Sequence, residues 1–192
     1  YPIIVAKDKN ENTVIYFDKD GDNKIGSEDS LVKTLDENEG EGARFGSGYS
    51  INIYGAGYNS DISRKSSICV IGGNINYIYG GGHNGISRKS SICVKGGNIN
   101  SIYGGGHNSD ISRKSSICVM GGNINYIYGG GKSDENNISA KVLSGTVIDI
   151  KGGKIGYIDA NGKADIGENT EEDEEIEILK IPVKDFKKFA KD

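Results

Sequence analysis

The sequence predicts an all-β fold, a single-stranded parallel β-helix (β-solenoid) of about five coils. Residues 62–82, 86–106 and 111–131 are near copies, reading ISRKSSICVIGGNINYIYGGG, ISRKSSICVKGGNINSIYGGG and ISRKSSICVMGGNINYIYGGG. Their cysteines, Cys69, Cys93 and Cys118, fall 24 and 25 residues apart. Within each copy, short β-branched runs alternate with glycine clusters, and no helical periodicity is present. A repeat of this length made of short strands is typical of one turn of a stacked-coil protein.

Aliphatic residues that recur at equivalent positions predict the core. One coil buries too few of them to offset the conformational entropy lost on ordering its chain, so the coils must stack. Four rows are expected: Ile68, Ile92, Ile117 and Ile148; Val70, Val94, Val119 and Ile150; Ile75, Ile99, Ile124 and Ile155; Ile78, Ile102, Ile127 and Ile158. A fifth row would contain Ile62, Ile86, Ile111 and Ile138.

Weaker copies of the pattern extend the repeat region on both sides. SINIYGAG at residues 50–57 precedes the three copies, and VIDIKGGKIGYIDANG at residues 147–162 follows them. The predicted organisation is therefore an N-terminal module at 1–41, a solenoid at 42–166, and an acidic linker at 167–192 with a C-terminal cap or the start of a next module. Because the only methionine is Met120, we expect the chain to be a fragment of a longer protein.

Composition excludes two classes of function. The formal net charge of −4 argues against a nucleic-acid binder that depends on phosphate contacts. No apolar run approaches the roughly 18 residues of a membrane-spanning helix, so no transmembrane segment is predicted in this fragment.

Residues 18–29, DKDGDNKIGSED, match the spacing of a twelve-residue calcium loop. Alternate residues of such a loop converge on one point, and a hard cation needs six to eight oxygen ligands there. Asn23 replaces the usual glycine at the sharp turn, and asparagine tolerates the left-handed conformation required. The alternative is an acidic turn that binds no metal. The predicted cofactor is Ca²⁺, with carboxylate ligands from Asp18, Asp20, Asp22 and Asp29 and the backbone carbonyl of Lys24.

The segment VIYFDKDGDNKIG and the GGNINYIYGGG repeats that follow it resemble large surface proteins of Gram-positive, often anaerobic, bacteria. In those proteins glycine-rich β-solenoid repeats follow an acidic turn, and the similarity covers most of residues 14–162. The loop also resembles an EF-hand or dockerin loop, although dockerins carry two loops with flanking helices and this chain has one. The resemblance implies an extracellular, cell-surface location and supplies no catalytic residues.

Two rows of side chains are candidate ligand-binding surfaces. Tyr54, Tyr79, Tyr103 and Tyr128 form a ladder that could bind sugar rings or simply stack on itself. A second tyrosine row, Tyr77, Tyr126 and Tyr157, is interrupted by Ser101. Arg64, Arg88 and Arg113 recur on one side and could meet an acidic glycan. The partners considered are a surface polysaccharide and a host or neighbouring surface protein.

Other reactive residues also fall in rows or turns. Cys69 shares strand parity with the variable position Ile71, Lys95 and Met120, so all three cysteines are expected to face outward as reduced thiols. His83 and His107 are expected to stack in exposed turns, with Asp110 the nearest acidic residue in sequence. An enzyme of the polysaccharide lyase or hydrolase class would need a carboxylate cluster in the irregular fourth coil, around Asp149, Asp159 and Asp165.

The sequence therefore favours a non-catalytic surface protein that acts as a rigid stalk or an adhesin-like presentation surface. The reason is symmetry, since rows of equivalent groups lack the single preorganised pocket that a transition state requires. A carbohydrate-binding module is the alternative from a different class.

Overall fold

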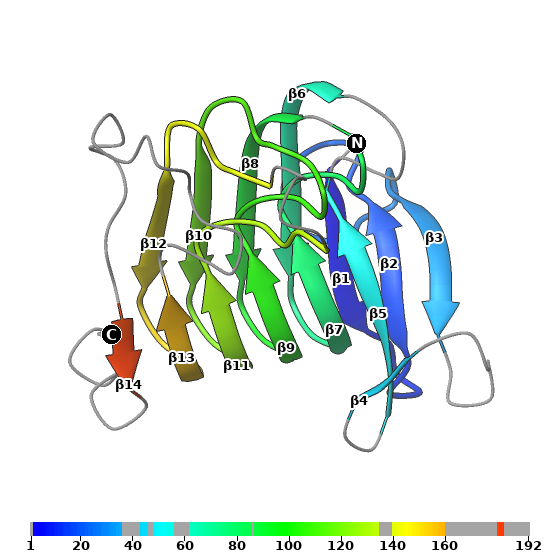
Figure 1. The fold of residues 1–192 in the computed structure, drawn as a ribbon. Helices are drawn as coiled ribbons and strands as arrows, with labels where there is room; N and C mark the ends of the chain where they lie inside the picture. Colours follow the sequence, from blue (N-terminus) through cyan, green and yellow to red (C-terminus); the bar gives the residue numbers. More distant parts are fainter. Residues whose placement is uncertain are drawn as a thin grey trace.

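The computed structural model describes residues 2–35, 43–45, 48–55, 62–85, 87–134, 140–159 and 180–182 of the chain. These residues form an all-β fold with two seven-stranded sheets (Figure 1). The first sheet has the strand order β12-β10-β8-β6-β1-β2-β3, and the second has the order β14-β13-β11-β9-β7-β5-β4. Both sheets are mixed and open, and parallel strands make up the part that contains the repeats.

The repeats alternate between the two sheets. Each copy contributes one strand to the first sheet and the next strand to the second, and both strands pair in parallel with their equivalents in the following copy. In the first sheet these strands are β6 Ile62–Val70, β8 Ser87–Val94, β10 Ser115–Val119 and β12 Thr146–Ile150. In the second they are β5 Gly48–Tyr54, β7 Asn74–Tyr79, β9 Asn98–Tyr103, β11 Asn123–Tyr128 and β13 Lys154–Asp159.

The N-terminal strands extend the first sheet. They are β1 Ile3–Lys7, β2 Thr13–Phe17 and β3 Ser30–Leu35. β1 pairs in parallel with β6, placing Ile4 opposite Cys69, and pairs antiparallel with β2 on its other side. The segment predicted as a separate module at 1–41 is thus hydrogen-bonded directly to the first repeat, a continuity that the sequence does not signal.

Short antiparallel strands lie at both ends of the second sheet. β4 Ala43–Phe45 pairs with β5, and β14 Lys180–Pro182 pairs with β13. Of the segment 167–192, predicted to hold an acidic linker and a cap or the start of a next module, the structure describes only β14. None of the residues that the structure describes forms a helix long and apolar enough to cross a membrane.

The core lies between the two sheets and confirms the four main aliphatic rows. Residues in register across β6, β8, β10 and β12 face those of β7, β9, β11 and β13, and together they form one buried cluster. Ile68, Val70, Ile75 and Ile78 are each exposed by 1% or less. Val5 and Ile53 extend the same cluster from β1 and β5.

The fifth predicted row is wrong in its alignment. Ile111 is fully buried, but it pairs with Ser87 on one side and with Val142 on the other. The predicted partners Ile86 and Ile138 lie outside the described residues. The shift arises because β6 carries an irregularity between Ile62 and Lys65 and because the last coil contains extra residues, so counting by a fixed period loses the register.

Buried hydroxyl groups donate hydrogen bonds to backbone carbonyl oxygens in the glycine clusters. Ser115 donates a hydrogen bond to the carbonyl oxygen of Gly104 over 2.7 Å. Ser66 and Thr146 make the equivalent contacts with Gly80 and Gly129. These bonds pair polar groups that would otherwise be buried without a partner.

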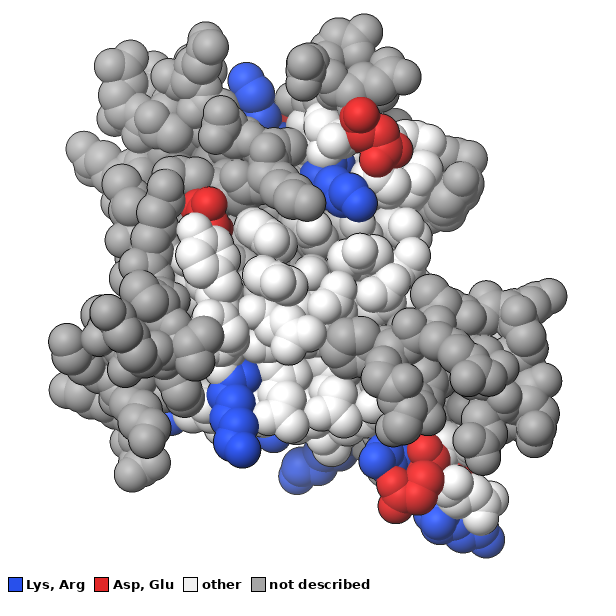
Figure 2. All heavy atoms as spheres, turned by 60° about the horizontal axis from the view of Figure 1, so that its bottom comes forward, with Lys and Arg blue, Asp and Glu red and all other residues white. Residues whose placement is uncertain are grey.

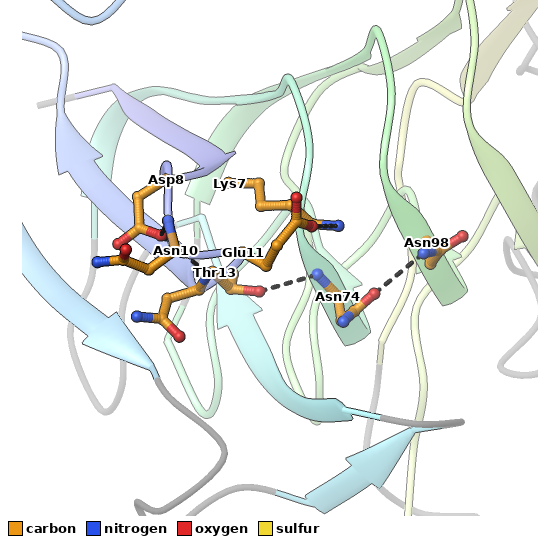
Figure 3. A network of polar contacts seen from close by, with 8 residues as sticks. Lys7, Asp8, Asn10, Glu11, Thr13, Asn74 and Asn98 are labelled. Carbon is orange, nitrogen blue, oxygen red and sulfur yellow. Dashed lines mark hydrogen bonds and ion pairs between the residues drawn. The ribbon is translucent and has the colours of Figure 1, made fainter.

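Asparagine side chains form ladders on the second sheet. Asn98 donates from Nδ2 to Oδ1 of Asn74 over 3.0 Å, and Asn123 donates to Asn98 over 3.1 Å. The ladder continues into the N-terminal strands, because the backbone N–H of Asn74 donates to Oγ1 of Thr13 (Figure 3). A second ladder joins Asn125 to Asn100 over 3.1 Å. Each coil is thus tied to the next by side-chain as well as backbone hydrogen bonds.

A methyl group added at Gly80, where neighbouring repeats approach closely, should destabilise the packing of the repeats. A Cβ added at Gly80 would lie 2.5 Å from the carbonyl oxygen of Gly104 and 2.9 Å from Cβ of Ser90. We expect Gly80→Ala to lower the free energy of unfolding by about 1–3 kcal/mol, the usual cost of overpacking. The measurement is urea denaturation followed by circular dichroism.

Gly26→Ala is the matched control, because its added Cβ would meet only Oδ2 of Asp29 at 3.8 Å. Its free energy of unfolding should stay within about 0.5 kcal/mol of the parent value. Equal effects of the two substitutions would contradict the close stacking at Gly80.

Candidate functional site

The loop between β2 and β3 gathers three carboxylates. Oxygen atoms of Asp18, Asp20 and Asp22 all lie within 4.8 Å of one another. Asp18 is fully buried, and its carboxylate accepts hydrogen bonds from the backbone N–H groups of Gly21 (2.8 Å) and Asn23 (3.0 Å). Its own backbone N–H donates to the carbonyl of Pro2 over 2.9 Å, which ties the loop to the start of β1.

The turn conformation agrees with the prediction for Asn23, whose φ is +60°. The predicted ligand Asp29 is held differently from the other three. Its two carboxylate oxygens accept the backbone N–H groups of Lys19 (2.9 Å) and Gly26 (2.7 Å), and it does not join the close group of three. Lys24 donates its backbone N–H to Asp22 over 2.8 Å. The structure therefore brings together three of the four predicted carboxylates and holds the fourth at the end of the same loop.

The carboxylates of the loop repel one another. The backbone N–H of Asp22 lowers the pKa of Asp20, but desolvation, the Asp18 side chain and the charges of Asp22 and Asp29 outweigh it, so this pKa is raised. An all-oxygen set of carboxylates is the donor set that hard divalent cations prefer.

The tyrosine ladder is stacked and largely buried. Successive ring centroids from Tyr54 through Tyr79 and Tyr103 to Tyr128 lie 5.0, 4.8 and 4.9 Å apart, with interplanar angles of 16° or less. Tyr79 and Tyr103 are each 2% exposed, and burial raises the pKa of both phenols. Because each inner ring has another tyrosine against its face, this ladder offers no free aromatic platform to a sugar there.

The second tyrosine row is more accessible. Tyr126 and Tyr157 pair in register and are 43% and 37% exposed. Ser101 occupies the break in the row and is 3% exposed, while the ammonium of Lys132 lies 5.2 Å from the ring centre of Tyr77. Among the described tyrosines, the exposed rings therefore belong to the row that the sequence treats as the weaker candidate.

The histidines form a polar corner beside the tyrosine ladder. His83 and His107 pair on neighbouring coils, and their ring centroids lie 4.4 Å apart. Desolvation and the neighbouring His107 lower the pKa of His83. The acidic partner of His107 is Asp134, 2.9 Å from Nε2, whereas the sequence suggested Asp110. Asp134 lies in the irregular segment after the third copy, where no repeat pattern could indicate its position.

The basic row stays at the surface. Arg88 and Arg113 are exposed and are linked by a 3.0 Å backbone hydrogen bond, and the side chain of Arg64 lies outside the described residues. Seen from the lower end of Figure 1, the middle of the described surface carries no charged side chain, and Lys and Arg lie at its margins (Figure 2). The row is a solvated edge that the sequence locates correctly.

The structure does not assemble the carboxylates considered for catalysis. Asp149 lies on β12 in the first sheet, opposite Cys118, and Asp159 ends β13 in the second sheet, opposite Tyr128. Asp165 lies outside the described residues. Asp149 instead contacts Lys151 at 3.6 Å, with both side chains exposed. The two described carboxylates therefore stand on different sheets and do not form an acid–base pair.

The cysteine row faces outward, as predicted, but its members differ in accessibility. Cys69, Cys93 and Cys118 pair in register, and their neighbours Ile68 and Val70 point into the core. Cys93 and Cys118 are partly exposed, whereas Cys69 is 1% exposed. Burial, followed by the nearby Cys93, raises the pKa of Cys69 to about 11. The expectation of three equally accessible thiols is therefore wrong for Cys69.

Comparisons with protein-family models, with curated proteins and with solved structures found no match to this chain.

Truncating an inner ring of the tyrosine ladder should cost stability. We expect Tyr103→Ala to lower the free energy of unfolding by about 3–5 kcal/mol, as for other buried aromatic residues. Tyr126→Ala is the matched control at an exposed position and should cost less than about 1 kcal/mol. Chemical denaturation of both variants gives the comparison, and a nearly neutral Tyr103→Ala would show that the ladder is not a structural element.

Proposed function

We propose that this chain is a β-solenoid module that acts as a rigid, non-catalytic spacer or presentation surface outside the cell. The observation that carries the proposal is the pairing of every repeat strand with its own equivalent in the next copy, in both sheets. Such pairing yields a stack whose coils are joined by continuous hydrogen bonds and a single core. In stacks of this kind each repeat packs on its neighbours along one axis, which keeps the two ends at a fixed separation.

The distribution of functional groups supports a structural role. Tyrosines, asparagines and cysteines each stack on their own equivalents, and the described candidate carboxylates Asp149 and Asp159 lie on different sheets. An extended partner such as a surface polysaccharide or a neighbouring surface protein fits a repetitive face better than a small substrate does. The extracellular location rests on the resemblance to bacterial surface proteins.

Hydrogen exchange can test the rigidity. The backbone N–H groups of Gly80, Gly104 and Gly129 each donate to the following coil over 2.8–2.9 Å. We expect these amides to exchange slowly and at similar rates, because they open only when the whole stack opens. Mass spectrometry after exchange in deuterated water measures them.

Two results would contradict the proposal. Fast, independent exchange at one coil boundary would reveal a hinge in place of a rigid spacer. Binding of a polysaccharide that is lost in Tyr126→Ala would instead favour a carbohydrate-binding module that uses the exposed tyrosine row.

We further propose that the loop at 18–29 binds Ca²⁺ and stabilises the end of the first sheet. The residues fit the ion, because Asp18, Asp20 and Asp22 supply converging oxygens and Asp29 is available at the end of the loop. When bound, the cation would neutralise the mutual repulsion of these carboxylates. The buried Asp18 and its hydrogen-bonded link to Pro2 would then connect ion binding to the stability of β1.

Removing calcium should therefore destabilise the protein. Extracellular modules bind Ca²⁺ with dissociation constants of about 10⁻⁴–10⁻³ M, so about 10 mM ion should add roughly 1.5–3 kcal/mol to the free energy of unfolding. The corresponding rise in Tm is about 3–10 °C. Thermal melts with Ca²⁺ and with chelator measure the difference.

Asp20→Ala should abolish the calcium dependence, whereas Asp149→Asn, a carboxylate far along the first sheet, should retain it. A melt that ignores both calcium and chelator would reject the site. A submicromolar dissociation constant would instead indicate an intracellular calcium sensor and would contradict the extracellular proposal.

A further inference from the structure

All sulfur atoms of the chain lie on one face of the first sheet. The sequence contains three cysteines and one methionine. Cys69, Cys93 and Cys118 occupy the same outward position on β6, β8 and β10. Met120 follows Cys118 by two residues with the same parity and is 42% exposed. The soft donor atoms of the chain are thus gathered on one face.

Adjacent thiols in this row are in contact. Cys93 pairs in register with Cys69 on one side and with Cys118 on the other, and it raises the pKa of both thiols. In-register parallel strands repeat at about 4.8 Å, so the sulfur atoms are spaced along a line. Within the described residues, no three side chains drawn from Cys, His, Asp and Glu converge around these thiols. The row therefore offers donor pairs and lacks the four converging ligands that structural zinc sites use.

The strand spacing limits the chemistry of each thiol pair. A spacing of about 4.8 Å lies within the Cα separations that a disulfide tolerates but above its Cβ separation of about 3.5–4.5 Å, so oxidation would need the two side chains to move together. Two metal–sulfur bonds placed end to end span about 4.6 Å if the zinc–thiolate length of about 2.3 Å is taken as a guide, and a two-coordinate cation therefore fits the strand spacing. Thiolate and thioether sulfurs select soft ions, of which Cu(I) is the first-row example.

We propose that Cys93 and Cys118 bind one Cu(I) ion in a linear arrangement, with the thioether of Met120 as a weaker third donor. The step balances without an oxidant: two thiols lose two protons, and one Cu(I) ion adds to give a bis-thiolate complex with one net negative charge. Copper remains Cu(I) throughout, and no sulfur is oxidised.

The pair Cys93–Cys118 is preferred to Cys69–Cys93 for two reasons. Both of its thiols are partly exposed, whereas Cys69 is 1% exposed. Met120 lies beside Cys118 on the same face, and nothing equivalent adjoins Cys69, where Ile71 occupies that position.

Charged groups of both signs lie near Cys118. The ammonium of Lys151 favours its thiolate, whereas the carboxylate of Asp149 disfavours it, and the two groups contact each other at 3.6 Å. Burial is the largest influence and raises the pKa of Cys118, so the metal must displace the thiol protons.

Anaerobic titration of the full, reduced chain with Cu(I) tests the proposal. A chromophoric Cu(I) chelator serves as the competitor, and ultraviolet thiolate-to-copper absorption reports the bonds. We expect one ion per chain and release of two protons, so affinity should fall by about 100-fold per pH unit on acidification. Cys93→Ser and Cys118→Ser should abolish binding, and Met120→Leu should weaken it several-fold.

Cys69→Ser is the matched control and should bind as the parent does, with circular dichroism confirming that every variant is folded. Retention of binding in Cys118→Ser, or its loss in Cys69→Ser, would overturn the assignment. Failure of the reduced chain to bind Cu(I), together with ready formation of a Cys93–Cys118 bridge under oxidised glutathione, would show a redox pair instead and would also overturn it.

Discussion

The structure depends on one constraint, the in-register stacking of equivalent residues at the spacing of β-strands. Within the paired repeat strands most positions meet their own copy on the neighbouring strands, so a side chain is retained there only if it packs well against itself. Isoleucine and valine satisfy this by filling the core, and asparagine does so by donating to the next asparagine. Tyrosine does so by stacking its ring at about 5 Å. Glycine is needed where the copies approach most closely, as at Gly80, where an added Cβ would lie 2.5 Å from the next backbone carbonyl.

The same constraint makes the two ends of the stack different from its middle. A repeat strand in the middle is paired on both sides, whereas a terminal strand needs a partner of another kind. At the N-terminal end that partner is β1, which pairs with β6 in parallel and then turns antiparallel into β2 and β3. At the C-terminal end of the second sheet, β14 pairs antiparallel with β13. The acidic loop at 18–29 thus lies in the segment that ends the first sheet.

Positions repeated in the sequence could be predicted, and positions outside the repeat could not. The four aliphatic rows and the outward parity of the cysteines follow from which residues stay constant and which vary, as with Ile71, Lys95 and Met120. The prediction of the fifth row was wrong because the segments next to its members differ in length. A fixed period pairs Ile111 with Ile86, whereas the structure pairs Ile111 with Ser87. The sequence also did not predict how deeply each cysteine is buried. Cys69 is 1% exposed and pairs with Ile4 of β1, and this contact joins segments more than sixty residues apart that no repeat pattern links.

The candidate sites likewise differ in how far the sequence alone could predict them. The group of three carboxylates in the loop was predictable because its members are encoded locally, within twelve residues whose spacing itself implies convergence. The contact between His107 and Asp134 was not, because Asp134 belongs to the irregular segment and its place in space depends on how that segment folds over the third coil. The tyrosine ladder was located correctly, yet its availability to a ligand depends on ring orientation. With interplanar angles of 16° or less, the inner faces are already occupied.

A stack of in-register coils also limits the geometry of any site built on it. Equivalent groups stand in a line, about 4.8 Å apart, and cannot turn toward a common centre without breaking the register. A line of donors suits a two-coordinate ion between adjacent rungs or an extended polymer across many rungs. Convergent coordination of a hard cation requires alternate residues of a curled segment, and the chain supplies that curl outside the repeats, at Asp18, Asp20 and Asp22. The separation of soft sulfur donors on the regular face from hard oxygen donors in the irregular loop is therefore a consequence of the fold.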